Sequence, residues 1–209
     1  MTSRSRAADT RQRLPAAARR TQLLEVALDR FAGGGYHATS MEEIADAAGV
    51  TKPVLYQHFR SKHELFLELL DTVGQNLLAE VEAKAAAEQN PYQRVLAGFR
   101  AYFRFVCERT SAFQLVFGGG ARLREEFAEP VRRLEEGMAE TIGRFIDADI
   151  DDAHRDLLGY AIVGLGEVSA RRWVSRRAGG LDPREADVMA LRLADLVWAG
   201  LRSLPPRAR

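Results

Sequence analysis

Residues 35–70 read GYHATSMEEIADAAGVTKPVLYQHFRSKHELFLELL, and this stretch decides the fold. Apolar residues from Met41 to Ala48 recur at the spacing of one helix face, which predicts a short helix. Ser40 with Glu43 three residues later has the pattern of a capping box, so this helix should begin directly after Ser40. Gly49 should end it, because glycine readily takes the positive φ of a helix end.

A second short helix is predicted from Lys52 to Phe59. Thr51 is a candidate cap, and Pro53 suits a first turn, where its missing N–H costs little. Leu55 and Phe59 fall on one side and are expected in the core. Two short helices joined by a tight turn form a helix-turn-helix, in which the second helix enters the major groove of DNA.

Helical patterns continue on both sides of this unit. A helix over residues 17–32 should stop at the glycines 33–35, and Ser61 with Glu64 predicts a second capping box before a long helix. Further helices are expected from Pro91, over 111–117, over 122–146 with Pro130 as a candidate break, over 152–178, and from Pro183 after an Asp182 cap.

The fold class is therefore all-α, with two domains and an arm. Residues 1–16 are expected to be a disordered basic arm, residues 17–62 a three-helix DNA-binding domain, and residues 63–209 a helical domain for effector binding and dimerisation. The arm either contacts DNA or only speeds association electrostatically.

Composition sets limits on the class of protein. The chain has 209 residues, is 46% hydrophobic and 28% charged, and carries a net charge of +1. Residues 1–62 hold 10 Lys/Arg against 6 Asp/Glu, whereas the remainder is slightly acidic, so a polyanion partner is expected at one end. The longest uncharged run, 110–121, is shorter than the ~20 residues of a membrane helix. We expect a cytoplasmic protein without a secretory signal or a membrane partner.

Signatures of catalysis or metal binding are missing from the sequence. His63-Glu64 lacks the second histidine of a zinc protease motif, the glycine triplets lack the ending of a phosphate loop, and no GxSxG elbow occurs. The lone Cys107 excludes an internal disulfide framework, and the histidines lack the spacing of a structural zinc site. We therefore expect no enzyme, no cofactor and no metal.

The segment from Gly35 to Leu70 strongly resembles the DNA-binding domain of the TetR family of bacterial transcriptional regulators. The resemblance rests on the aromatic after the glycines, Ala-Thr-Ser, Ile-Ala-x-x-Ala-Gly-Val, Leu-Tyr-x-His-Phe and Ser-Lys-x-Glu-Leu-Phe. It implies a homodimer on a pseudo-palindromic operator, released when a small molecule in the C-terminal domain moves the DNA-reading helices. The regulated genes are not implied, and an activator of the same fold is an alternative to a repressor.

Several candidate DNA contacts follow from the residues themselves. Thr39 and Ser40 lie at a helix N-terminus, which favours a phosphate. Lys52 can reach a phosphate or guanine, Val54 a thymine methyl, and Gln57 an adenine or a phosphate.

The resemblance adds further contacts to the operator backbone. It implies this role for Tyr56, His58 and Lys62, and Pro53 completes the candidate set. Each has an ordinary alternative: Tyr56 as a surface aromatic, His58 as a partly buried structural residue, and Lys62 as a solvated cation.

The C-terminal domain offers candidates for an unknown small-molecule effector. Its apolar composition favours a lipophilic or amphipathic compound. The candidates are Phe103, Cys107, Phe113, Phe117, Met138, Tyr160, Glu167 and Trp173. Aromatic residues at helical spacing are also typical of a core, and Glu167 either orients the ligand or pairs with Arg171 one turn on.

The last two helices are apolar on most faces and must be covered on several sides. We predict that they form the dimer interface, with Leu165, Val168, Arg172, Leu196 and Trp198 as candidates. The alternative is that both helices fill the core of the monomer. A different class of function also stays open, namely an all-helical small-molecule-binding protein without specific operator binding.

Overall fold

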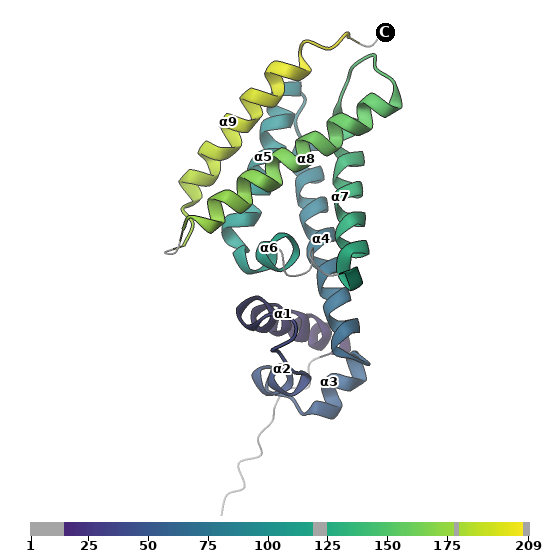
Figure 1. Ribbon diagram of the computed structural model, residues 1–209, viewed down its shortest axis with the longest axis vertical. Helices are drawn as coiled ribbons and strands as arrows, with labels where there is room; N and C mark the ends of the chain where they lie inside the picture. Colours follow the sequence, from purple (N-terminus) through teal and green to yellow (C-terminus); the bar gives the residue numbers. More distant parts are fainter. Residues whose placement is uncertain (1–14, 119–124, 178–179, 207–209) are drawn as a thin grey trace, which may run out of the picture.

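A computed structural model describes residues 15–118, 125–177 and 180–206. Within these ranges the chain forms nine α-helices and no strand, which confirms the all-α prediction (Figure 1). The helices are α1 (Ala16–Gly34), α2 (Met41–Ala47), α3 (Lys52–His58), α4 (Lys62–Ala86), α5 (Pro91–Glu108), α6 (Thr110–Phe117), α7 (Glu125–Phe145), α8 (Asp152–Ser175) and α9 (Pro183–Leu201). The arm predicted over residues 1–16 lies outside the described residues, apart from Pro15 and Ala16, where α1 begins.

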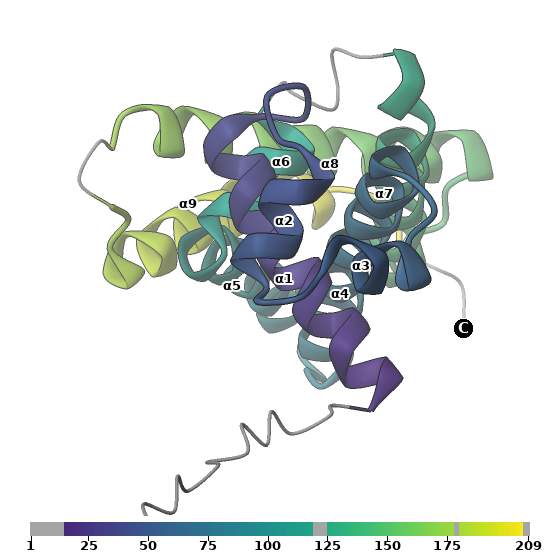
Figure 2. The ribbon, with the colours of Figure 1, turned by 90° about the horizontal axis from the view of Figure 1, so that it is seen from below.

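Helices α1, α2 and α3 pack together at one end of the molecule, beside the first turns of α4 (Figures 1 and 2). Their shared core is fully apolar: Leu23 and Phe31 come from α1, Ile44 from α2, and Leu55 and Phe59 from α3 and its end, each with 2% or less of its surface exposed. The predicted inward positions of Leu55 and Phe59 are confirmed.

The helix caps show where the sequence patterns work and where they fail. The capping box of α2 is complete, because the Ser40 hydroxyl accepts from the Glu43 N–H and the Glu43 carboxylate accepts from the Ser40 N–H. At α4 the box is only half formed: the Ser61 hydroxyl accepts from the Glu64 N–H, but the Glu64 carboxylate accepts from the Arg60 N–H instead.

The predicted Thr51 cap is wrong, since its side chain makes no capping hydrogen bond. A cap accepts from the second or third N–H of the helix. Here the second position is Pro53, which has no N–H, and the Val54 N–H binds the Thr51 backbone carbonyl at 2.9 Å. Asp182, in contrast, caps α9 by accepting from the Arg184 N–H.

Pro130 does not break its helix, and α7 continues through it to Phe145. The proline removes one N–H near the start of the helix, where the hydrogen-bond ladder is just beginning. The long helix predicted over 152–178 ends at Ser175.

The 25-residue helix α4 is the rod that joins the two parts of the molecule (Figure 1). It leaves α3 and runs through the body beside α7, with which it packs. The two helices approach closely at Gly74, where an added Cβ would lie 3.1 Å from a δ-carbon of Leu134. A side chain at this position would require Leu134 to move by a few tenths of an ångström.

The other body helices complete a layered bundle. Helix α5 packs against both α4 and α9, and α8 packs against α7. None of the described helices is long and apolar enough to span a bilayer.

An aromatic cluster joins the body to the unit formed by α1, α2 and α3. Phe127 of α7 lies with its ring centroid 4.5 Å from Phe66 of α4 and 4.8 Å from Tyr36, which follows α1. His63 also stacks on Phe127, with the ring centroids 5.5 Å apart. Helix α6 also contacts α1, so the three-helix unit is held from two sides.

Candidate nucleic-acid interface and ligand cavity

Helix α3 presents one open face. Lys52, Pro53, Tyr56 and Gln57 are exposed, and Tyr56 keeps 43% of its surface accessible. Val54 and His58 are half-buried at the edges of this face. Tyr56 therefore lies outside the three-helix core, where its ring and hydroxyl can be reached from solution.

The two residues before α2 differ in what their hydroxyls do. Thr39 is buried, and its hydroxyl lies within hydrogen-bond distance of the carbonyls of Arg30 and Gly35. It therefore fixes the connection between α1 and α2. Ser40 is exposed and caps α2, and the first N–H groups of a helix have no partner within the helix, so this end of α2 can accept an anion from solution.

Lys62 is tied into the structure rather than freely solvated. Its ammonium donates to the carbonyls of Tyr36 at 2.9 Å and Thr39 at 3.0 Å, and more weakly to that of His37 at 3.4 Å. It also lies 4.6 Å from the centre of the Tyr36 ring. The lysine thus holds the segment between α1 and α2 against the start of α4.

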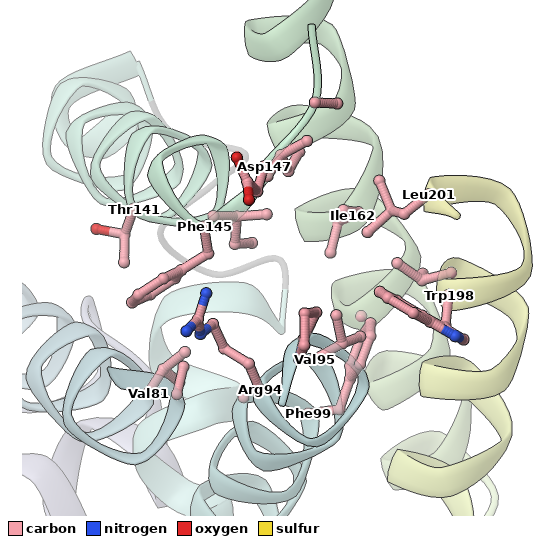
Figure 3. Close-up of a pocket in the computed structure, with 18 of the residues that line it drawn as sticks. Val81, Arg94, Val95, Phe99, Thr141, Phe145, Asp147, Ile162, Trp198 and Leu201 are labelled. Carbon is pink, nitrogen blue, oxygen red and sulfur yellow. The ribbon is translucent and has the colours of Figure 1, made fainter. Parts of the chain in front are cut away.

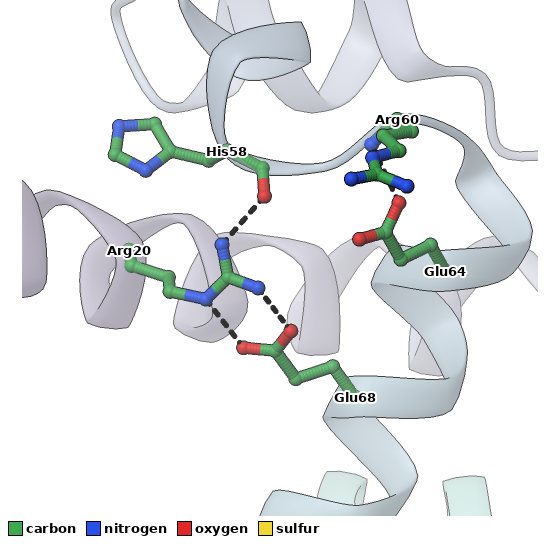
Figure 4. Close-up of polar contacts among 5 residues, drawn as sticks. All are labelled: Arg20, His58, Arg60, Glu64 and Glu68. Carbon is green, nitrogen blue, oxygen red and sulfur yellow. Dashed lines mark hydrogen bonds and ion pairs between the residues drawn. The ribbon is translucent and has the colours of Figure 1, made fainter.

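Arg20 joins three helices at the end of α3 (Figure 4). Its guanidinium binds both oxygens of Glu68 on α4 and donates to the backbone carbonyl of His58, and it lies 4.3 Å above the Phe59 ring. The hydrogen bond to Glu68 raises the pKa of Arg20 above its ordinary value. Sequence reasoning missed this cluster, because 48 residues separate the two charges.

A cavity of about 480 Å³ lies in the body (Figure 3). The helix ends that line it are remote from α1–α3, as the ribbon in Figure 1 shows. Its walls come from α4, α5, α7, α8, α9 and the segments after α7 and α9. Most of the wall is apolar, as Val81, Val95, Phe99, Ile162 and Trp198 illustrate in Figure 3. The volume and the composition suit a small lipophilic molecule.

Of the eight residues predicted to bind the effector, only Met138 lines this cavity. Phe103, Phe113 and Phe117 are fully buried and pack in the core. Tyr160 lies with 40% of its surface exposed, on a part of α8 outside the cavity. Helical spacing identified these side chains as apolar but could not separate core from cavity wall.

The remaining three candidates have structural partners. Glu167 is buried and its carboxylate lies 3.5 Å from the Arg171 guanidinium, as the pairing alternative predicted. The Trp173 indole donates to Glu185 at 3.0 Å. Cys107 is half-buried beside the Leu181 carbonyl. Burial is the main cause that raises the pKa of the Cys107 thiol, which disfavours the reactive thiolate.

The residues predicted for a subunit interface fall into two groups. Val168 of α8 and Leu196 of α9 are exposed by 56% and 61%, and Arg172 is exposed as well. Leu165 is half-buried, and Trp198 is half-buried and lines the cavity. Three further apolar side chains, Leu157, Val188 and Leu191, are exposed on the same two helices.

Comparison with known proteins agrees with this geometry. The family model described as bacterial regulatory proteins of the tetR family matches residues 23–69, which include α2 and α3. The transcriptional activator FasR of Mycolicibacterium smegmatis is 34% identical over 195 residues, covering 92% of this chain and 87% of that protein. The chain belongs to the TetR family. It is a DNA-binding transcriptional regulator.

Other family members differ in their action. The transcriptional repressor KstR2 of Mycolicibacterium smegmatis is 29% identical over 153 residues, covering 66% of this chain and 74% of that protein. Among solved structures, FadR of Bacillus subtilis in complex with stearoyl-CoA has a TM-score of 0.74 at 15% identity, covering 86% of this chain and 98% of that one. The second similarity shows the fold alone.

Proposed function

We propose that the protein is a homodimeric regulator that binds a pseudo-palindromic operator and leaves it when a lipophilic or amphipathic molecule enters the cavity. One observation carries the proposal: α4 and α7 line the apolar cavity at one end and hold the DNA-binding unit at the other. A ligand that shifts these helices changes the position of α3.

The DNA contacts follow from the open face of α3 and its surroundings. Lys52, Tyr56 and Gln57 point away from the core and can reach one major groove, with Pro53 and Val54 beside them. Ser40 and the first turn of α2 bind a phosphate. Thr39 and Lys62 contribute to DNA binding indirectly, because they hold the connection before α2 in place. His58 contributes from its position at the end of α3. Because a bacterial operator lies in the cytoplasm, we also place this protein there.

The apolar surface of α8 and α9 supports a dimer. Leu157, Val168 and Leu196 are among the most exposed large apolar residues of the described chain. Gly164 lies between the first two on α8, and an added Cβ there would have no atom within 4 Å. A glycine in mid-helix costs stability, and here it leaves room for a partner helix to approach closely. A two-fold interface of this kind matches a two-fold operator.

The cavity supports an effector with an aliphatic part. Its wall is mainly apolar, and the related fold of FadR is known in complex with stearoyl-CoA. We infer that fatty acids and their thioesters are the first compounds to test.

The test begins with purified protein and sheared DNA from its own genome, with the bound fragments sequenced at moderate salt. The proposal expects enrichment of one or a few pseudo-palindromic sites. The Tyr56→Ala variant should lose this enrichment, whereas Gln75→Ala, an exposed residue of α4 outside the DNA end and outside the proposed interface, should keep it. Diffuse, salt-sensitive enrichment in all three proteins would favour a small-molecule-binding protein without specific operator binding.

The dimer is tested separately by sedimentation. Val168→Glu places a charge in the proposed interface and should yield monomers with weak operator binding. Unchanged dimers would move the interface elsewhere.

Activation is a second candidate function, favoured by the similarity to FasR, which covers 92% of this chain and is named an activator. A reporter gene downstream of the enriched site distinguishes the two. Removal of the protein should raise expression if it represses and lower expression if it activates.

A further inference from the structure

The cavity has a mouth and an inner end. Gln89, Asp147 and Arg202 line it and are exposed, so they mark the mouth at the end remote from α1–α3. Tyr102 and Gly166 line it and are buried, so they mark the inner end. The two ends lie along α5, on which the lining positions run inward from Pro91 to Tyr102.

Arg94 of α5 lies between these ends, nearer to the mouth, and points into the cavity (Figure 3). Its Nε and Nη2 donate to the Glu88 carbonyl at 3.3 and 3.1 Å, and the guanidinium lies 5.5 Å from the centre of the Phe145 ring. Among the described residues, no carboxylate lies within ion-pair distance of Arg94, and Nη1 makes no hydrogen bond. A half-buried cation in an apolar wall thus keeps unused donors.

We propose that the effector carries an anionic head group, a carboxylate or a phosphate, which binds Arg94, while its aliphatic tail extends inward to Tyr102 and Gly166. This inference rests on the proposed function, since it assumes that the cavity is the effector site.

The chemistry of the wall favours this orientation. A guanidinium presents paired N–H donors that fit a carboxylate or a phosphate. Exposed Arg202 adds a second positive charge at the mouth, and Asp147 is the one acidic residue among the described lining positions. The inner end offers Phe99, Val163 and Gly166, which suit a methylene chain.

The experiment compares three probes of equal chain length: palmitate, hexadecanol and palmitoyl-CoA. Affinities are measured by isothermal titration calorimetry on the full chain. A hydrogen bond to a charged group predicts that an anionic probe binds about 10- to 100-fold more tightly than hexadecanol. Palmitate binding that depends on Arg94 identifies a carboxylate head, and dependence seen only with palmitoyl-CoA identifies a phosphate.

Three variants test the role of Arg94. Arg94→Gln should remove most of the difference between the anionic probe and hexadecanol without weakening hexadecanol. Arg94→Lys should keep part of it. Arg133→Gln, an exposed arginine of α7 outside the cavity, should change nothing. Retained hexadecanol binding shows that the Arg94→Gln variant is folded.

The orientation has its own test. An added Cβ at Gly166 would meet Tyr102 at 3.5 Å, an ordinary contact, so a larger side chain fills the inner end. Gly166→Leu should shift the preference from palmitate to laurate, whereas Gly200→Leu, a helical glycine outside the cavity, should not.

Equal affinities for palmitate, palmitoyl-CoA and hexadecanol, or a ratio unchanged in Arg94→Gln, would overturn the inference. A complete lack of lipid binding would do the same. Operator binding, measured on the same samples, reports separately on the proposed function, so the two failures are distinguishable.

Discussion

Replacing Arg20 by methionine should loosen the end of α3. Methionine keeps the apolar stem of the side chain but lacks the guanidinium, so the charge and its contact with the Phe59 ring are lost together. Two bonds to Glu68 and one to the His58 carbonyl disappear.

The magnitude follows from the exposure of the pair. Hydrogen bonds to a charged partner contribute about 1.5–3 kcal/mol when protected, and exposed ion pairs contribute about 0.2–1 kcal/mol. Arg20 and Glu68 are 36% and 30% exposed, between these limits, so solvent screens part of the attraction. We expect a coupling free energy of about 1 kcal/mol, and a total loss of about 2 kcal/mol in Arg20→Met, since the His58 carbonyl also loses its donor.

The assay is a double-mutant cycle with Arg20→Met, Glu68→Gln and the combined variant, measured by urea unfolding. Operator affinity, measured by fluorescence anisotropy, should fall about threefold to tenfold in Arg20→Met, because a tenfold change corresponds to about 1.4 kcal/mol. A coupling below about 0.3 kcal/mol, together with unchanged operator affinity, would refute the reasoning that this pair positions α3.

Three further predictions concern the DNA end of the molecule. Tyr56→Phe should leave the free energy of unfolding within about 0.5 kcal/mol of the wild type, because the side chain is exposed, yet weaken operator binding; a change in unfolding without one in binding would contradict it. Lys62→Met should lower the unfolding free energy by about 1 kcal/mol, because partly buried carbonyls lose a charged donor; unchanged stability in urea would mean that Lys62 acts on DNA alone. Hydrogen bonds from Ser40 lower the pKa of Glu43, so its ionised form is stabilised in the folded state. Glu43→Gln should therefore be less stable than the wild type above the ordinary carboxyl pKa, and the gap should close as the pH falls through the lowered pKa. A gap that persists in acid, measured by urea unfolding across the pH range, would show that charge is not the cause.

The helix-turn-helix could be predicted from sequence because its signals are local. Ser40 with Glu43, the turn at Gly49 and the spacing of Leu55 and Phe59 each act within one or two turns of helix. The Thr51 prediction failed for an equally local reason, since Pro53 removes one of the two donors that a cap can use and the other, the Val54 N–H, binds the Thr51 backbone carbonyl.

The cavity could not be predicted, because a void arises where helices far apart in sequence fail to fill the space between them. Phe99 and Phe103 lie one turn apart on α5, yet Phe99 lines the cavity and Phe103 packs in the core. Trp198 is predicted for the subunit interface from its apolar helix, but its side chain lines the cavity. Apolar spacing identifies the inward face of a helix, not what that face meets.

The close approach of α4 to α7 at Gly74 makes this residue a natural pivot point for α4. Gly74 lies 12 residues from Lys62 and 11 from Ala85, about 18 Å and about 16 Å along the axis. If α4 tilts as a rigid helix about this point, its two ends move by similar distances in opposite directions. A tilt of α4 that widens the cavity by one ångström would displace the base of the DNA-reading unit by about as much, without amplification and without loss.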